Sequence, residues 1–345
     1  MVSFQSKKVC KSKKKKSQMV DIPKITSNMS ITDMLNLAVN AVVRPPRASY
    51  NEEEISYIVF DMHLPPIPRI PMSFPNRRGE RLVGSLYLSG SFYTEKTHNC
   101  IIYLHGNIGS QKEGRQIVPY FAPNGISVFC FDFSGSGNSG GKYVTLGKKE
   151  KTDVPDVCTF LHENYEIDNF ILWGRSMGAA TAILSCQSTR MIRGLIVDSA
   201  YSSLEDMLDD VSKKLKMNSV SSMFASWFIK KGVYDRVGLS INDVQPAEVA
   251  KTCWKPLLLG HSPEDDFIPF SQAEKIYKAY GGPKEIVILT GPHNSPRDEN
   301  WIKPCRAFIG RVLGIPMEEL EMKVTQESAP EHVATFMSLL GEEGI

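Results

Sequence analysis

Residues 170–186 read FILWGRSMGAATAILSC, the segment of the sequence that is most informative about its structure. It begins with an apolar run of strand length and ends with small apolar residues that suit a buried helix. Between them lies Gly174-Arg175-Ser176-Met177-Gly178, which has the form G-x-S-x-G. In such a motif the glycines let neighbouring backbone come close, and the serine oxygen projects from the edge of a sheet. The sequence therefore predicts a sharp strand-to-helix turn with an exposed Ser176.

The alternation of short apolar runs and longer stretches of helical length continues on both sides of this segment. Six runs end in turn residues: CIIYLHG (100–106), ISVFCFDF (126–133), FILWG (170–174), GLIVDSA (194–200), PLLLGH (256–261) and EIVILTG (285–291). Near-continuous apolar strands separated by helices indicate a parallel sheet that is covered on both faces. Active sites in such sheets gather at the carboxyl ends of the strands, so functional residues are expected in the loops after these runs.

The residues before the first run predict a helix and an antiparallel pair of strands. Ser30 is expected to cap a short amphipathic helix, because apolar residues follow it at helical spacing. Arg44-Pro45-Pro46-Arg47 ends this helix, since proline cannot continue the hydrogen-bond ladder. A turn at Asn76-Arg77-Arg78-Gly79 then joins two strands expected near 68–75 and 80–88.

Residues 201–252 are too many for a plain connection between the fourth and fifth runs. They contain the helical patterns LEDMLDDVSKKLKM and SSMFASWFIKKGVYDRV, which we interpret as a small helical cap over the crevice. Residues at helical spacing in the second pattern are Phe224, Trp227, Phe228 and Lys231, with Met223 beside them. They indicate either a groove for an acyl chain or packing of the helix onto the core, which is the usual role of an amphipathic stripe.

Charge divides the chain into a central domain with two unlike ends. Seven lysines fall within Lys7–Lys16, and this like-charge block predicts a disordered polybasic segment over residues 1–25. One α/β domain is expected over 26–313, with its last helix near 298–313. The tail over 314–345 carries seven glutamates and one lysine and predicts one or two weak helices.

Length and composition exclude several classes of protein. The 345 residues are 42% hydrophobic, 23% charged and 9% aromatic, which suits a folded core and rules out global disorder. A net charge of +2, from 40 basic and 38 acidic residues, argues against a nucleic-acid binder, which usually has a basic surplus. The sequence has no run of about 18 apolar residues that would predict a transmembrane helix, and its first residues lack an apolar signal stretch.

Ser176 needs two partners before it can act as a nucleophile. Its hydroxyl requires a general base, and the base requires an acid that orients it, in the chain order serine, then acid, then histidine. His293 follows the last apolar run, although a loop histidine that bonds only to backbone would give the same pattern. The loop after PLLLGH offers the carboxylates Glu264, Asp265 and Asp266, and Asp198 at the end of the preceding run is a rival.

Negative charge that develops on an attacked carbonyl group needs preorganised N–H donors. The residue after the nucleophile, Met177, supplies one donor, and the loop after the first parallel strand supplies the other. His105-Gly106-Asn107 lies in that loop, so the Asn107 N–H is the candidate. His105 is then a residue that shapes the turn and not a base.

A second glycine motif, Gly135-Ser136-Gly137-Asn138-Ser139-Gly140, formally matches the dinucleotide pattern G-x-G-x-x-G. A dinucleotide site needs a helix that begins at this turn, whereas the following GKYVTLGKK has no helical periodicity. We therefore interpret the segment as a glycine-rich loop beneath the active site.

These motifs resemble those of the α/β-hydrolase superfamily, in particular its serine-aminopeptidase-like branch, which is related to prolyl oligopeptidase. The similarity spans about residues 41–313 and rests on RPPRASY (44–50), LHGNIGS (104–110), FDFSGSGNSGG (131–141), YVTLG (143–147), LWGRSMGA (172–179), VDSAYS (197–202), GHSPEDDFIP (260–269) and GPHNS (291–295). The resemblance implies an α/β-hydrolase fold, with a mostly parallel, doubly wound sheet and a small helical cap. It carries over Ser176, Asp265 and His293 as the catalytic triad, because D-x-x-I-P recurs after this strand in related hydrolases. Asn107 and Met177 carry over as the oxyanion donors.

Membrane-associated acyl-protein thioesterases form a neighbouring branch, similar in the P-P-x-x-x-Y segment and the HGN loop. They anchor through an N-terminal cluster of palmitoylated cysteines, whereas the N-terminal segment of this chain has one cysteine, Cys10, set among the lysines. Cys10 is thus a candidate for lipidation, and Lys7–Lys16 is a candidate contact with an acidic membrane surface, at roughly 1 kcal/mol per basic residue. A solvated or nuclear-targeting lysine run is the other interpretation.

The resemblance implies a serine hydrolase that cleaves an ester, thioester or amide bond of a small substrate through an acyl-enzyme, with no metal or organic cofactor. An ester or thioester is favoured over a peptide. A serine peptidase of aminopeptidase type and a catalytically silent binding scaffold stay open as alternatives. Seven scattered cysteines without a C-x-x-C pair indicate reduced, mostly buried thiols, so a cytoplasmic location is expected, either free or peripheral on the cytoplasmic face of a membrane.

Overall fold

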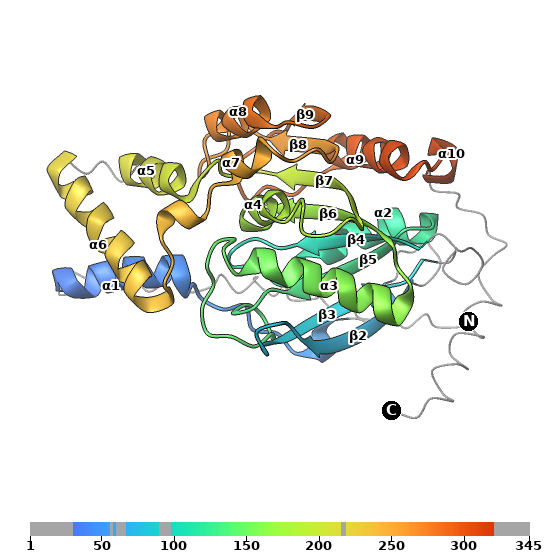
Figure 1. Cartoon of the computed structure of the whole chain (residues 1–345), viewed down its shortest axis with the longest axis horizontal. Helices are drawn as coiled ribbons and strands as arrows, with labels where there is room; N and C mark the ends of the chain where they lie inside the picture. Colours follow the sequence, from blue (N-terminus) through green and yellow to red (C-terminus); the bar gives the residue numbers. More distant parts are fainter. Residues whose placement is uncertain (1–29, 56–57, 60–66, 90–97, 215–218, 321–345) are drawn as a thin grey trace, which may run out of the picture.

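A mixed β-sheet is the centre of the structure (Figure 1). The computed structural model describes residues 30–55, 58–59, 67–89, 98–214 and 219–320. Within these ranges nine strands form one sheet, in the order β1-β2-β3-β5-β4-β6-β7-β8-β9. Their bounds are β1 Ile58–Val59, β2 Ile67–Pro75, β3 Arg81–Tyr87, β4 Asn99–Leu104, β5 Ser127–Asp132, β6 Asn169–Arg175, β7 Ile192–Asp198, β8 Leu257–His261 and β9 Lys284–Ile288. All six predicted apolar runs are confirmed as strands, β4 to β9.

Strands β4 to β9 are parallel, so their carboxyl ends lie along one edge of the sheet. Strands β1, β2 and β3 extend the sheet in antiparallel pairing, and β3 joins the parallel part through β5. The predicted turn after β2 makes a hairpin, in which Pro75 pairs with Arg81. The mostly parallel sheet expected from the sequence is therefore confirmed.

Helices cover both faces of this sheet. Their bounds are α1 Ile31–Val43, α2 Val118–Phe121, α3 Glu150–Tyr165, α4 Met177–Leu184, α5 Leu204–Lys214, α6 Ser219–Val237, α7 Pro246–Ala250, α8 Phe270–Ala279, α9 Glu299–Leu313 and α10 Met317–Leu320. Short 3₁₀ turns are η1 Glu52–Glu54, η3 Glu113–Ile117, η4 Ala122–Asn124 and η5 Ile241–Asp243. No helix in the described part of the chain is both long and apolar enough to cross a membrane.

The hydrophobic core lies in two layers, one on each face of the sheet. One layer joins the strands to α3, α4 and α8, and the other joins them to α2 and α9. Every residue of β4, β5 and β8 is buried, as expected for strands that are covered on both faces. The six cysteines among the described residues are free and buried, which confirms the prediction for these thiols.

Helix α1 begins after Ser30, whose side chain accepts a hydrogen bond from Asp33 N, and it ends before the two prolines as predicted. The helix packs against α6, with Val39 buried at the contact beside Gly232 (Figure 1). The sequence predicts both helices but not their pairing. On α6, Trp227 is 58% exposed, so the hypothesis that this stripe packs onto the core is wrong for Trp227.

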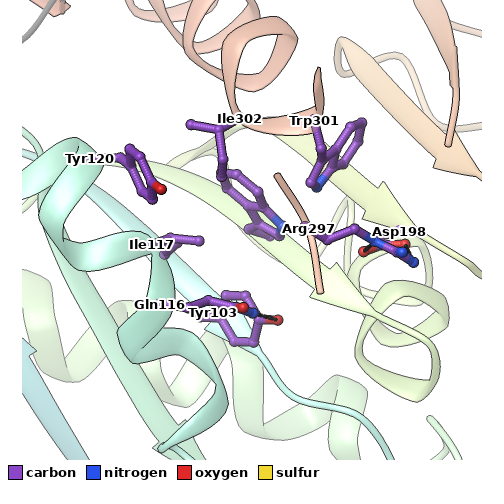
Figure 2. Close-up of a pocket in the computed structure, with 9 residues that line it drawn as sticks. Tyr103, Gln116, Ile117, Tyr120, Asp198, Arg297, Trp301 and Ile302 are labelled. Carbon is purple, nitrogen blue, oxygen red and sulfur yellow. Dashed lines mark hydrogen bonds and ion pairs between the residues drawn. The ribbon is translucent and has the colours of Figure 1, made fainter. Parts of the chain in front are cut away.

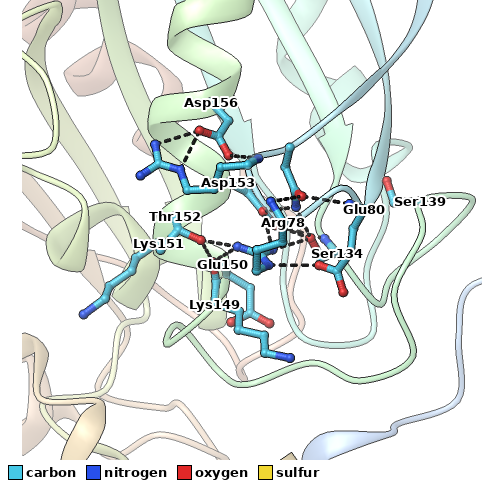
Figure 3. Close-up of polar contacts among 12 residues, drawn as sticks. Arg78, Glu80, Ser134, Ser139, Lys149, Glu150, Lys151, Thr152, Asp153 and Asp156 are labelled. Atoms are coloured by element: carbon cyan, nitrogen blue, oxygen red, sulfur yellow. Dashed lines mark hydrogen bonds and ion pairs between the residues drawn. The ribbon is translucent and has the colours of Figure 1, made fainter.

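A polar cluster fixes the β2–β3 turn to the start of α3 (Figure 3). The Arg78 guanidinium donates hydrogen bonds to Asp153, Ser134 and Glu80, over 2.6 to 3.0 Å. Burial raises the pKa of Asp153, and the Arg78 charge only partly offsets this effect. Because Ser134 begins the glycine-rich loop, the cluster holds that loop against the sheet.

Arg47 holds the other side of the glycine-rich loop. Its guanidinium donates to the carbonyl oxygens of residues 136, 137, 139 and 141. Tyr50 donates to the buried Asp132 carboxylate at the end of β5 over 2.5 Å. No helix begins at residues 135–140, and the next one, α3, starts at Glu150. The segment is therefore a loop, as interpreted, and lacks the helix that a dinucleotide site requires.

Residues 1–29 and 321–345 lie outside the described residues. The predictions for Cys10, Lys7–Lys16 and almost all of the acidic tail fall there, and so do the membrane contact and the lipidation that rest on them. They stay predictions.

Candidate active site

Ser176 occupies the turn between β6, which ends at Arg175, and α4, which begins at Met177. Its backbone has φ 54° and ψ −116°, a conformation that side-chain-bearing residues rarely adopt. Strain of this kind persists only where the surroundings enforce it, and it is typical of functional sites. The predicted strand-to-helix turn is confirmed.

Gly178 makes this turn possible because α4 passes very close to β4. A Cβ atom at position 178 would collide with the Leu104 carbonyl oxygen. We expect Gly178→Ala to lower the free energy of unfolding by about 3 kcal/mol, the upper range for overpacking. Gly238→Ala is the control without a collision: Gly238 has nothing within 4 Å of the added atom, although its φ is positive (63°), unlike that of Gly178. The control should cost about 1 kcal/mol; equal losses in urea unfolding would contradict the packing argument.

Three predicted residues meet at the carboxyl edge of the sheet. The Ser176 hydroxyl lies 3.1 Å from Nε2 of His293, and Nδ1 of His293 lies 2.7 Å from the Asp265 carboxylate. Asp265 and His293 are buried, with 7% and 6% exposed. The distances are those of hydrogen bonds in which Ser176 donates to the ring and the ring donates to the carboxylate.

The turn after β8 prepares Asp265 for this contact. Its second carboxylate oxygen accepts hydrogen bonds from the N–H groups of Phe267 and Ile268, at 2.8 and 2.7 Å. Burial acts to raise the pKa of Asp265, but the hydrogen bond and charge of His293 and these two N–H groups outweigh burial and bring the pKa below its ordinary value. Asp265 is therefore a carboxylate across the neutral pH range.

The two predicted oxyanion donors lie beside Ser176. Met177 N–H is at the first position of α4, and neither it nor Asn107 N–H donates to another described residue. Asn107 follows Gly106, where an added Cβ would lie 3.9 Å from Ser176 Cβ. His105 is buried, with its ring bonded to Gly106 O and Phe133 N, so it shapes the turn as interpreted.

Comparison with known proteins agrees with this fold. The sequence profile of a family described as serine aminopeptidase, S33, matches residues 95–240. The solved structure of a Pyrococcus furiosus esterase matches with a TM-score of 0.58 and 22% identity, covering 72% of this chain and 92% of that one. The chain therefore has the α/β-hydrolase fold.

Curated relatives match a smaller part of the chain. The uncharacterised protein YqkD of Bacillus subtilis is 30% identical over 203 residues, which are 57% of this chain and 65% of that protein. A lysophosphatidylserine lipase of Danio rerio is 24% identical over 197 residues. That match covers 53% of this chain and 47% of the lipase, so this chain spans about half the length of that relative.

The other carboxylates that the sequence offered as candidates for the triad acid have different partners. Asp198 does not meet His293; the Arg297 guanidinium donates to both of its oxygens, at 2.7 and 2.8 Å. Glu264 and Asp266 are exposed residues of the turn that carries Asp265. The Glu264 carboxylate accepts a hydrogen bond from Gly291 N, and the Asp266 carboxylate accepts one from His293 N. Both therefore hold the loop after β9 that carries His293, which we call the histidine loop.

The candidate site also contains an arginine that was not predicted from the sequence. Arg175 donates two hydrogen bonds of 2.8 Å, to the carbonyl oxygens of His293 and Ser295, and its Nε lies 3.8 Å from Asp198. The side chains of Arg175, Asp198 and Arg297 are at most 12% exposed. The variable position of G-x-S-x-G, filled here by arginine, was the available signal. This buried cluster joins β6, β7 and the histidine loop.

Behind the cluster lies a cavity of about 110 Å³ between α2 and α9 (Figure 2). Figure 2 shows Arg297 and Asp198 at one side of it, below Trp301, with Tyr103 and Gln116 across from them. Its walls come from the second core layer, on the sheet face that α2 and α9 cover. The cavity therefore lies beside the buried cluster of Arg175, Asp198 and Arg297, which holds the histidine loop.

We expect Arg175 to be a positioning residue for His293. Arg175→Met should lower kcat for an ester about tenfold or more with little change in KM, because two charge-assisted hydrogen bonds are lost at a distance from the substrate. Arg175→Lys keeps the charge without the planar fork and should recover part of kcat. A fall in thermal stability with unchanged kcat would assign Arg175 a purely structural role.

Proposed function

We propose that this α/β-hydrolase is a serine hydrolase that works by acyl transfer. The observation that carries the proposal is the continuous hydrogen-bond chain from Ser176 through His293 to Asp265, built on a strained strand-to-helix turn. His293 takes the proton of Ser176 as the oxygen attacks a carbonyl carbon. Asp265 orients the imidazole ring and favours its charged form.

The oxyanion that forms in this attack is stabilised by two backbone N–H groups. Those of Met177 and Asn107 are proposed for this role, because both are free of other described partners next to Ser176. His293 then gives its proton to the leaving group. Water, activated by the same histidine, releases the acid from Ser176.

Esters and thioesters suit the mouth of this site better than peptides. Two large apolar residues beside the triad are exposed: Phe267 at 42% and Ile108 at 54%. The Phe267 ring lies 5.2 Å from the His293 ring, centroid to centroid, and Ile108 follows the proposed oxyanion donor. Exposed apolar groups at a reactive centre favour a substrate with an aliphatic acyl chain.

Hydrolysis of three matched compounds tests this proposal. We expect the protein to cleave p-nitrophenyl butyrate and a butyryl thioester, with a burst of product that reports the acyl-enzyme, and to cleave alanyl p-nitroanilide far more slowly. Cleavage of the anilide alone would favour the peptidase. A folded protein that cleaves none of the three would favour the silent binding scaffold.

A further inference from the structure

A small niche adjoins the proposed oxyanion site. It has a volume of about 10 Å³, enough for one water-sized group. Its lining comes from the segment after α1, from the loop after β4 and from the glycine-rich loop. Three segments that are distant in sequence therefore converge on a space for a single small group.

Two buried polar atoms belong to residues that line this niche. They are Oδ1 of Asn107 and Oγ of Ser136, and neither has a hydrogen-bond partner among the described residues. Ser136 is only 4% exposed. Buried polar groups are nearly always paired in native proteins, because an unpaired one loses its bonds to water without replacement. The niche thus provides one acceptor and one hydroxyl for a bound group.

The hydrogen-bonding capacity of these two atoms favours an uncharged hydroxyl as the bound group. The amide oxygen of Asn107 only accepts, whereas the hydroxyl of Ser136 both donates and accepts, so a hydroxyl group can bond to both at once. Arg47 also lines the niche, and its guanidinium donates to the Ser136 carbonyl oxygen, so the positive charge nearby disfavours an ammonium group. Pro45, Pro46 and Val144 make the remaining wall apolar.

The niche lies close to the reacting carbonyl. Asn107 presents its N–H to the proposed oxyanion and its side chain to the niche. A Cβ atom added at the preceding residue, Gly106, would lie 3.9 Å from Ser176 Cβ, and consecutive Cα atoms are about 3.8 Å apart. A hydroxyl within a few bonds of the scissile carbonyl is therefore within reach.

We propose that Asn107 and Ser136 form a subsite for an uncharged hydroxyl group of the substrate, so that the preferred substrates are hydroxylated esters. The inference rests on the proposed function and narrows its substrate class. It also separates the protein from an aminopeptidase, whose substrate carries an ammonium group near the scissile carbonyl.

Two pairs of neutral esters test the subsite with the full-length protein. Ethyl 3-hydroxybutyrate is compared with ethyl butyrate, and 2-hydroxyethyl butyrate with propyl butyrate, by kcat/KM. We expect a preference of about tenfold or more for the hydroxylated ester in at least one pair. Ethyl 3-aminobutyrate, with a cation at the same position, should react more slowly than ethyl 3-hydroxybutyrate.

Ser136→Ala should bring this preference close to one, and Asn107→Leu, which keeps the backbone N–H, should do the same. Ser139→Ala is the matched control from the same loop, because the Ser139 hydroxyl already bonds to Asp132 O and Val83 N. The control should keep the wild-type ratio. Equal rates within both pairs, or a preference that Ser136→Ala leaves intact, would overturn the inference and leave the proposed function standing.

Calorimetric binding to Ser176→Ala separates the two proposals. If wild type cleaves no ester but Ser176→Ala binds the hydroxylated ester more tightly than its plain partner, the subsite is supported and the proposed function fails. If there is neither cleavage nor a difference in binding, both fail.

Discussion

Ser176→Ala is expected to lower kcat for p-nitrophenyl butyrate about 10⁴-fold or more. The serine oxygen is the atom that bonds to the carbonyl carbon in the proposed mechanism, and alanine has no atom to replace it. The hydroxyl lies 3.1 Å from His293 Nε2, so the base is already placed for proton transfer. Initial rates at saturating ester measure this effect.

Ser185→Ala is the control for that substitution. Ser185 follows α4, and its buried hydroxyl donates to the Thr181 carbonyl oxygen away from the triad. We expect the control to keep kcat within a few-fold while costing about 1 kcal/mol of unfolding free energy. A folded Ser176→Ala protein with wild-type kcat would remove the serine from the mechanism.

Asp265→Asn is expected to lower kcat about 10⁴-fold. The carboxylate accepts a hydrogen bond of 2.7 Å from Nδ1 of His293, which fixes the ring orientation and stabilises its charged form. An amide at this position carries no charge and can hold the His293 imidazole in the wrong tautomer. The neighbouring Asp266→Asn is the control, since its amide oxygen can still accept from His293 N, and it should lower kcat by less than tenfold.

The effect of Asp265→Asn on the free energy of unfolding should also depend on pH. Because the pKa of Asp265 in the folded protein lies below its ordinary value, the carboxylate contributes stability above about pH 4, the unfolded pKa. That contribution disappears as the pH falls through the lowered pKa. The difference in free energy of unfolding between wild type and Asp265→Asn should therefore be constant near neutrality and shrink in acid. A difference that grows in acid, or a loss of kcat with Asp266→Asn instead, would contradict the assignment of Asp265.

Local sequence patterns predicted most of this fold because its strands are buried on both faces. The runs that became β4 to β8 are almost continuously apolar, and few other structures accommodate such short runs between helices. Prolines 45 and 46 stop α1 by chemistry that needs no tertiary contact. The packing of α1 on α6 could not be predicted in this way, because it joins residues about 200 positions apart.

In the candidate site, too, local sequence predicted some residues, whereas others depend on tertiary contacts. Ser176 and His293 could be found from a motif and from chain order, and Asp265 from a family resemblance. Arg175 and Asp198 were not predicted as partners, because charged residues at strand ends give no periodic signal. The hydrogen bonds of Asp266 and Glu264 to backbone N–H groups were not predicted for a related reason: an exposed carboxylate in a turn has the same local pattern whether or not a distant loop donates to it.

The proposal that Ser176 is the activated nucleophile is tested most directly by covalent labelling with a fluorophosphonate, a reagent that reacts with activated serines. The full-length protein is incubated with the reagent and digested, and the modified peptide is located by mass spectrometry. We expect one adduct per chain, on Ser176, with labelling lost in Ser176→Ala and strongly slowed in Asp265→Asn. An adduct on another residue, or a folded protein without any adduct, would contradict this proposal.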